Sequence, residues 1–168
     1  KSLALGDADA RGQRPLIIDG DEVRTLKSGT FRVDAAASGA TKVRFAPSVG
    51  AKAREIAASF GPGAVRLLDR KADLKVSAGT AELDAKSGAQ AVYRLEGSLA
   101  CGLVGCPVRT VVRKGGRDVV VLEGFAKGDV WVMGSGRDGV RAMVLDSAVG
   151  PVAYAFDGRR YVADGPRR

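Results

Sequence analysis

Two cysteines carry the strongest chemical signal in this chain. Cys101 and Cys106 stand five positions apart in the stretch LACGLVGCP, with Gly-Leu-Val-Gly between them. A structural zinc site needs four ligands, usually Cys and His, and the chain has no histidine and no third cysteine, so we predict no metal site. A redox centre of the thioredoxin type needs a C-x-x-C spacing followed by a helix. Here the spacing is longer, and the residues after Cys106 read as a strand.

A structural disulfide is the third interpretation of this pair, and we predict it. Gly102 and Gly105 permit the tight backbone turn that brings the two sulfurs together. Closing a loop of about six residues contributes roughly 2 kcal/mol to stability on the chain-entropy estimate. Because disulfides persist in oxidising compartments, the pairing favours a periplasmic or secreted protein. The chain starts at Lys1 rather than Met, which we interpret as a mature form after signal-peptide removal.

Catalysis by other residues finds little support in the sequence. Without histidine, nucleophilic sites of the Ser-His-Asp and Cys-His types are excluded. Paired carboxylates remain available for an envelope hydrolase, but each candidate stands beside glycine or at a strand end, where Asp also favours turns. We therefore assign no catalytic residue and no cofactor, and expect a non-catalytic protein. The candidate carboxylates are Glu96, Glu123, Asp129, Asp146 and Asp157.

The chain is basic, with 27 Lys and Arg against 19 Asp and Glu and a formal net charge of +8. Such a charge favours anionic partners. One run, Arg109, Arg113, Lys114 and Arg117, has no acidic residue within it. It is the expected contact for a protein or for an anionic component of the cell envelope. Nucleic acid is not an expected partner, because single-strand binding also needs stacking aromatic side chains and this run has none.

Two apolar residues are candidate anchors for a protein interface. Trp131 is the only tryptophan, a residue type enriched at binding hot spots. We expect it to pack in a core with Phe125, Met133 and Met143, and the anchor role is the alternative. Leu103 stands in the loop between the cysteines, and a rigid loop loses little entropy on binding. We expect a non-catalytic binding or accessory module of the cell envelope, with an enzyme inhibitor acting through this loop as the alternative.

Short strands are the elements that must position these residues. Apolar and polar residues alternate in TFRVD and TKVRF, and further short runs follow between Gly, Asp and Ser. One helix is expected near residues 48–60, with Ser48 as its cap and Gly61-Pro62 at its end. The fold class is therefore α+β, predominantly antiparallel β, as a sandwich or a barrel-like sheet. The expected strands are 15–18, 22–26, 30–34, 41–46, 65–69, 74–77, 81–84, 91–96, 108–113, 118–122, 130–133, 140–145 and 152–156.

The organisation of the chain follows from its composition. Residues 1–14 are polar and are expected as a mobile lead-in to one β-rich domain over 15–168, for which a division into 15–85 and 86–168 is an alternative. No apolar stretch is long enough for a transmembrane helix. The continuous run DVVVL at 118–122 indicates a central strand covered on both faces. GSGRDG at 134–139 predicts a hairpin turn, because a strand and not a helix follows it.

The second half of the chain resembles uncharacterised exported bacterial proteins. In these proteins a strand leads into a C-G-x-x-G-C loop and then a Val-rich strand, as residues 93–113 do here. The stretch YAFDGRRY at 154–161 resembles their aromatic-x-F-D-G-x-x-Y end. The likeness covers residues 90–162. It implies a β-rich fold and a periplasmic or secreted location, and it implies no activity.

Overall fold

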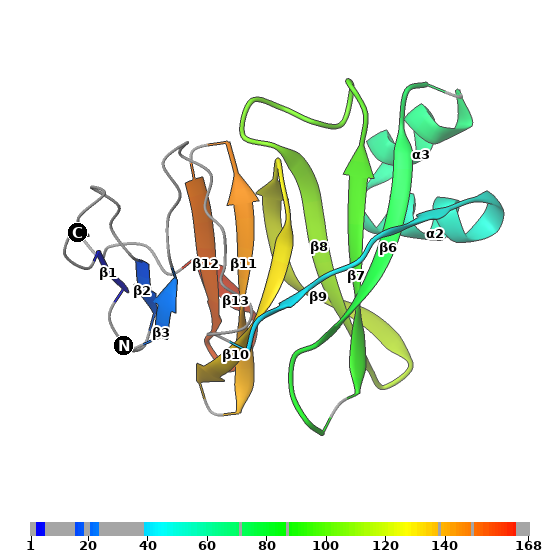
Figure 1. Ribbon diagram of the computed structural model, residues 1–168. Coiled ribbons are helices and arrows are strands. Elements are labelled where there is room, and N and C mark those ends of the chain that lie inside the picture. Colours follow the sequence, from blue (N-terminus) through cyan, green and yellow to red (C-terminus); the bar gives the residue numbers. More distant parts are fainter. Residues whose placement is uncertain are drawn as a thin grey trace.

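Antiparallel strands make up most of the chain that the computed structural model describes, which is residues 3–5, 16–18, 21–23, 39–70, 72–86, 88–137, 139–148 and 150–163. Two short helices accompany them (Figure 1). The helices are α2 (Gly50–Ser59) and α3 (Pro62–Asp69). The strands are β1 (Leu3–Leu5), β2 (Leu16–Ile18), β3 (Asp21–Val23), β4 (Thr41–Lys42), β5 (Ala46–Ser48), β6 (Lys75–Glu82), β7 (Ala89–Glu96), β8 (Cys106–Lys114), β9 (Arg117–Ala126), β10 (Val130–Arg137), β11 (Val140–Ser147), β12 (Gly150–Phe156) and β13 (Tyr161–Ala163).

Two five-stranded antiparallel sheets pack against each other around one shared core. The first, here called the helix-covered sheet, has the order β5-β6-β7-β8-β9, and the second, the C-terminal sheet, has the order β13-β12-β11-β10-β4. Side chains from both sheets fill the space between them, among them Val92, Leu122, Met143 and Leu145, which are buried. The fold is therefore α+β and sandwich-like rather than a barrel, which confirms the predicted class.

One segment passes from one sheet to the other at the side of the sandwich. Thr41 and Lys42 pair with β10 of the C-terminal sheet. A few residues later, β5 pairs with β6 of the helix-covered sheet. Figure 1 shows this segment crossing in front of both sheets before it enters α2. The single strand predicted over 41–46 is therefore two short strands in different sheets.

The helices cover the outer face of the first sheet. Ala53, Ile56 and Ala57 of α2 pack with Leu95 of β7 and Val111 of β8 in a second core. The apolar residues of the predicted helix recur at helical spacing and were expected to form one buried face, and this part of the prediction is confirmed. Among the described residues no helix is both long and apolar enough to cross a bilayer.

The boundaries around the helices differ from the prediction. Ser48 lies in β5 and caps nothing, because the cap position of α2 is Val49, which has no side-chain cap bond. The strand predicted over 65–69 is wrong, since these residues belong to α3. Pro62 ends α2 as expected but also starts α3, where a proline at the first helical position lacks only an N–H that would be unpaired anyway.

The run at 118–122 is also placed differently from the prediction. It lies in β9, which is the edge strand of the helix-covered sheet and not a central one. Val119 and Val120 remain partly exposed there, while Val121 and Leu122 are buried in the shared core. A bulge in the β8–β9 register at this point explains why two consecutive residues face the core. A strand with four consecutive apolar residues therefore need not have other elements packed on both of its faces.

Several hairpins agree with the sequence. β2 and β3 pair as predicted from Asp-Gly. β10 and β11 also pair as a hairpin, but β10 continues through Arg137, so only the last two residues of the GSGRDG stretch lie between the two strands. The two strands predicted over 74–77 and 81–84 are one continuous strand, β6. Residues 3–5 of the expected lead-in form β1, which pairs with β2. The strand predicted over 30–34 lies outside the described residues.

Candidate functional site

The disulfide closes a two-residue turn between β7 and β8. Cys101 and Cys106 are joined, with 4.1 Å between their Cα atoms. Inside the ring, Gly102 N donates to Gly105 O at 3.0 Å and Gly105 N donates to Gly102 O at 3.2 Å. Only Leu103 and Val104 therefore form the tip, and the loop is a tight hairpin. The predicted structural disulfide is confirmed. We call residues 101–106 the disulfide hairpin.

Contacts from both sheets hold the disulfide hairpin. The backbone of Gly105 has a φ of +132°, and a Cβ there would lie 2.6 Å from backbone atoms of Ala126 and Lys127. This close approach to the end of β9 requires glycine. On the other side, Ala148 N of the β11–β12 turn donates to Val104 O at 3.1 Å. The tip is thus fixed against the C-terminal sheet as well as the helix-covered sheet.

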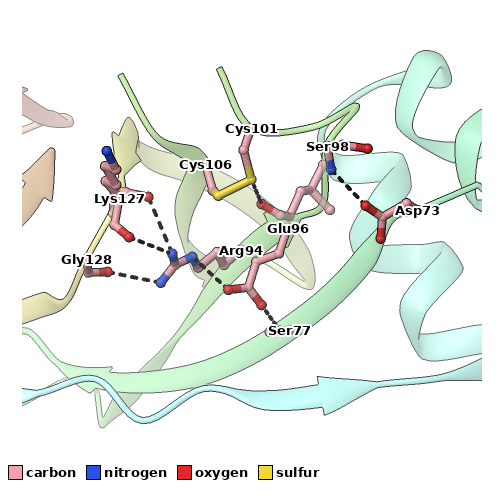
Figure 2. Close-up of a disulfide and its surroundings, with 11 residues drawn as sticks. Asp73, Ser77, Arg94, Glu96, Ser98, Cys101, Cys106, Lys127 and Gly128 are labelled. Atoms are coloured by element: carbon pink, nitrogen blue, oxygen red, sulfur yellow. Dashed lines mark hydrogen bonds and ion pairs between the residues drawn. A yellow bond between two sulfur atoms is a disulfide. The ribbon is translucent and has the colours of Figure 1, made fainter. Parts of the chain in front are cut away.

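An arginine supports the base of the disulfide hairpin. Arg94 Nη1 of β7 donates to Gly128 O at 3.0 Å, and Figure 2 shows its side chain reaching below the disulfide toward the backbone of Lys127 and Gly128. Its Nε lies 3.4 Å from Glu96 Oε1 without hydrogen-bond geometry. Ser77 Oγ donates to the other oxygen of Glu96 at 3.1 Å. Three elements are therefore connected beneath the hairpin.

The loop that leads into the hairpin is fixed by an aspartate. Ser98 N donates to Asp73 Oδ2 at 3.0 Å (Figure 2). This backbone hydrogen bond, with a side-chain bond from the same serine, lowers the pKa of Asp73 below its ordinary value. Cys101 N also donates to Gly97 O at 2.9 Å. The hairpin is consequently held on its entry side as well.

Large apolar side chains are exposed on and around this rigid hairpin. Leu103 at the tip is 97% exposed, and its neighbour Val104 is 42% exposed. Leu99, just before the hairpin, is 62% exposed, and Phe125, near the end of β9, is 47% exposed. Leu103 was predicted as an anchor. Phe125 was predicted in a core with Trp131, and its exposure corrects that assignment.

An apolar groove lies beside the hairpin. It has a volume of about 480 Å³ and runs between the two helices and the β8–β9 strands. Leu99 and Phe125 lie in its wall, so the exposed side chains and the groove form one surface. Its other apolar lining residues are Phe60, Ala64, Leu67, Leu74, Leu95, Ala100, Pro107 and Val108.

Two members of the predicted basic run have acidic partners. Arg109 pairs with Glu123 across the strands, and its guanidinium lies 5.0 Å from the centre of the Phe60 ring. Arg113 lies on the same face of β8 and pairs with Asp118 at 3.5 Å.

The other two members of the run are at the end of the hairpin. Lys114 and Arg117 are opposite each other across the β8–β9 turn, and both are exposed. In the described part of the chain neither makes an ion pair. Two of the four cations are therefore neutralised by neighbours, and two are not.

Two of the five candidate carboxylates lie together. Asp146 N donates to Asp129 O at 2.9 Å. Burial, and then the neighbouring charge of Asp129, raise the pKa of Asp146 above its ordinary value. Asp129 itself pairs with Lys42 at 2.7 Å. Neither residue lines the apolar groove beside the hairpin.

The remaining candidates have structural partners. Glu96 contacts Arg94 and Ser77, and Glu123 contacts Arg109. Asp157 accepts hydrogen bonds from the backbone N–H groups of Arg159 and Arg160, which lower its pKa. Across the described ranges, no three acidic or cysteine side chains gather as metal ligands.

Trp131 packs on the outer face of the C-terminal sheet. It is partly buried against a small cluster that contains Ala40, Met133, Val144 and Ala153. The Lys42 ammonium lies 6.0 Å from its ring centre. Met143 belongs instead to the shared core between the sheets. Of the predicted core group, Trp131 and Met133 therefore lie on the outer face of this sheet, Met143 lies on its inner face, and Phe125 lies on the helix-covered sheet.

Comparison with known proteins suggests no function for this chain, so the proposal below rests on the geometry. No protein-family profile, curated protein sequence or solved structure matches the chain. Sequence reasoning identified the hairpin and Leu103, but it missed Leu99, Val104 and Phe125. The first two lie within or next to the cysteine stretch, so their closeness to the disulfide was a usable signal. For Phe125 the sequence carries no such signal, because its neighbours depend on strand register.

Proposed function

We propose that this protein is a non-catalytic binding module that docks on a partner protein through the disulfide hairpin. The observation that carries the proposal is Leu103, almost fully exposed at the tip of a hairpin that is closed by a disulfide and fixed to both sheets. Exposing a leucine in water is unfavourable, and inserting it into an apolar pocket recovers that free energy. Because the loop is already rigid, little conformational entropy is lost on docking.

The surroundings of Leu103 indicate what kind of partner fits. Leu99, Val104 and Phe125 extend the apolar surface, and contiguous exposed apolar patches mark interaction sites. The tip is convex and the groove beside it is concave. A partner with an apolar pocket for Leu103 and an apolar ridge for the groove complements both. An enzyme whose cleft accepts the hairpin is one such partner, so inhibition is a specific form of this function.

The compartment is part of the proposal. The disulfide fixes the geometry of the tip, and such bonds persist outside the reducing cytosol. The likeness of residues 90–162 to exported bacterial proteins supports the same location. We therefore place the binding module in the periplasm or outside the cell, as an accessory protein of the envelope.

Site-specific photocrosslinking tests the proposal. A photoreactive phenylalanine analogue replaces Leu103 in one variant and Arg159 in a control, and both are irradiated in the source envelope extract. Arg159 is also exposed but lies in the β12–β13 turn. We expect one crosslinked protein from position 103 only, competed away by unlabelled protein. The Leu103→Asp variant should compete at least tenfold less well, and Leu103→Met should compete normally.

The same experiment can contradict the proposal. Identical crosslinks from positions 103 and 159, or equal competition by Leu103→Asp and the wild type, would show that the hairpin tip is not the contact. Reduction of the disulfide adds a further check. Loss of competition after reduction, with the fold intact by circular dichroism, is the expected result.

A further inference from the structure

The helix-covered sheet divides at the end opposite the disulfide hairpin. β6 and β7 remain paired as far as Glu82 and Ala89, and β8 and β9 remain paired as far as Lys114 and Arg117. Between these two hairpins, however, the register of β7 with β8 ends at Ala91 and Val111. Figure 1 shows the lower ends of the two hairpins diverging below the helices.

A cleft of about 520 Å³ lies where the hairpins diverge. Side chains of the shared core line it, so the division of the sheet gives access to the interior of the sandwich. Its volume falls within the range of roughly 300–1,000 Å³ typical of sites for small molecules. The apolar lining residues include Leu83, Val111, Val121, Val140 and Phe156.

Of the three cations that line the cleft, two have an acidic partner. Lys52 pairs with Glu55 at 3.0 Å, and Arg113 pairs with Asp118 at 3.5 Å. The carboxylate of Asp84 accepts a hydrogen bond from the backbone of its own turn. Lys114 also lines the cleft and makes no ion pair among the described residues.

A second free cation stands beside Lys114. Arg117 lies directly opposite Lys114 across the β8–β9 turn and is likewise unpaired in the described chain. The turn between them consists of Gly115 and Gly116, both with positive φ, so the Cα atoms of the two cations face each other across a two-residue turn. The cleft therefore combines an apolar interior with one free positive charge in its lining, that of Lys114, and a second on the neighbouring strand, that of Arg117.

We propose that this cleft binds an amphipathic anion, with an acyl chain in the divided sheet and a carboxylate or phosphate at Lys114 and Arg117. An apolar interior favours burial of a hydrocarbon chain. A free ammonium and a free guanidinium favour an anionic head through charge-assisted hydrogen bonds. The site is separate from the disulfide hairpin, so it does not depend on the proposed protein contact.

Calorimetric titration with decanoate, at concentrations where it is monomeric, tests the proposal. We expect one decanoate to bind per chain, with weaker binding of uncharged decanol and none of acetate. Lys114→Glu should weaken decanoate binding by about tenfold or more, because it replaces an attractive charge with a repulsive one. Lys127→Glu makes the same charge change at an exposed position near the disulfide hairpin and should leave binding unchanged.

A second variant fills the cleft without touching the buried core. Ala89 lines the cleft and is exposed at the start of β7, so Ala89→Trp should block the acyl chain while the protein stays folded. Absence of decanoate binding, or binding that Lys114→Glu and Lys127→Glu weaken equally, would overturn the proposal. A binding measurement with lipid vesicles distinguishes a membrane lipid from a free fatty-acid anion as the ligand. Binding to phosphatidylglycerol vesicles without binding to monomeric decanoate would also overturn a cleft for the acyl chain.

Discussion

At the scale of single residues, Arg94 has more structural consequence than any of the arginines in the predicted basic run. Its side chain is only 13% exposed. It joins β7 to the backbone after β9 by a 3.0 Å hydrogen bond to Gly128 O, with longer contacts of 3.5 Å to Ala126 O and Lys127 O. Buried guanidinium groups need such acceptors, since an unpaired buried charge is strongly unfavourable. Arg94 thus sets the position of the strand end on which the disulfide hairpin packs.

We expect Arg94→Ala to lower the free energy of unfolding by about 1–2 kcal/mol, because it leaves part-buried carbonyl groups without a donor. Arg94→Lys should lie in between, since an ammonium keeps the charge but lacks the planar fork. Urea denaturation with the disulfide intact gives the measurement. The control is Arg159→Ala, an exposed position where a change within about 0.5 kcal/mol is expected. Equal stability of the two alanine variants would contradict the role given to Arg94.

At the scale of elements, the disulfide hairpin depends on its two glycines in different ways. Gly105 has positive φ and no room for a Cβ, whereas Gly102 has neither constraint, and a Cβ there would meet nothing within 4 Å. The two positions flank the same two-residue tip. They therefore offer a matched pair of substitutions within one turn.

Gly105→Ala should displace the hairpin from the end of β9 and lower stability by about 1–3 kcal/mol, since both backbone strain and a backbone clash oppose it. Gly102→Ala should be close to neutral. Thermal unfolding of the two oxidised proteins, with the disulfide verified by intact mass, makes the comparison. If both alanines had the same effect, the close packing of Gly105 on Ala126 would not matter for stability.

The elements also show how far the sequence can predict this fold. Alternation identified most strands of the second half, and the spacing of Ala53, Ile56 and Ala57 identified α2, because these patterns depend only on which face is buried. The run at 65–69 was ambiguous, since five residues fit both a strand and one turn and a half of helix. The edge position of β9 depends on sheet order, which is a non-local property that short-range periodicity does not encode.

The candidate site, like the fold, was predictable only where short-range sequence determines it. The disulfide and the exposure of Leu103 follow from two cysteines and two glycines in six residues. The cleft does not, because it arises where two hairpins separate and its lining comes from α2, three strands of one sheet and three of the other. The acidic partners of the basic run were unpredictable for a similar reason. Glu123 and Asp118 face Arg109 and Arg113 only because of the β8–β9 register.

At the scale of the whole molecule, one core joins the two large sheets. Val92 and Val108 come from the helix-covered sheet, and Val130, Met143 and Leu145 come from the C-terminal sheet. Further bonds cross between them, including Arg141 N to Leu83 O at 2.7 Å and Thr110 Oγ1 to the Met143 sulfur at 3.4 Å. Neither sheet can keep its inner face buried if the other unfolds.

We therefore expect the two sheets to unfold in a single cooperative transition. Hydrogen exchange of the Val92 amide reports on the helix-covered sheet, and that of the Leu145 amide reports on the C-terminal sheet, as does the fluorescence of Trp131. The free energies of global exchange of Val92 and Leu145 should agree within error with each other and with the free energy of unfolding from Trp131 fluorescence. The alternative division at residues 85 and 86 predicts otherwise. It places β6 and β7 in different subdomains although they pair over eight residues. Two separate transitions would favour that division and would weaken the argument that the hairpin, fixed to both sheets, is rigid.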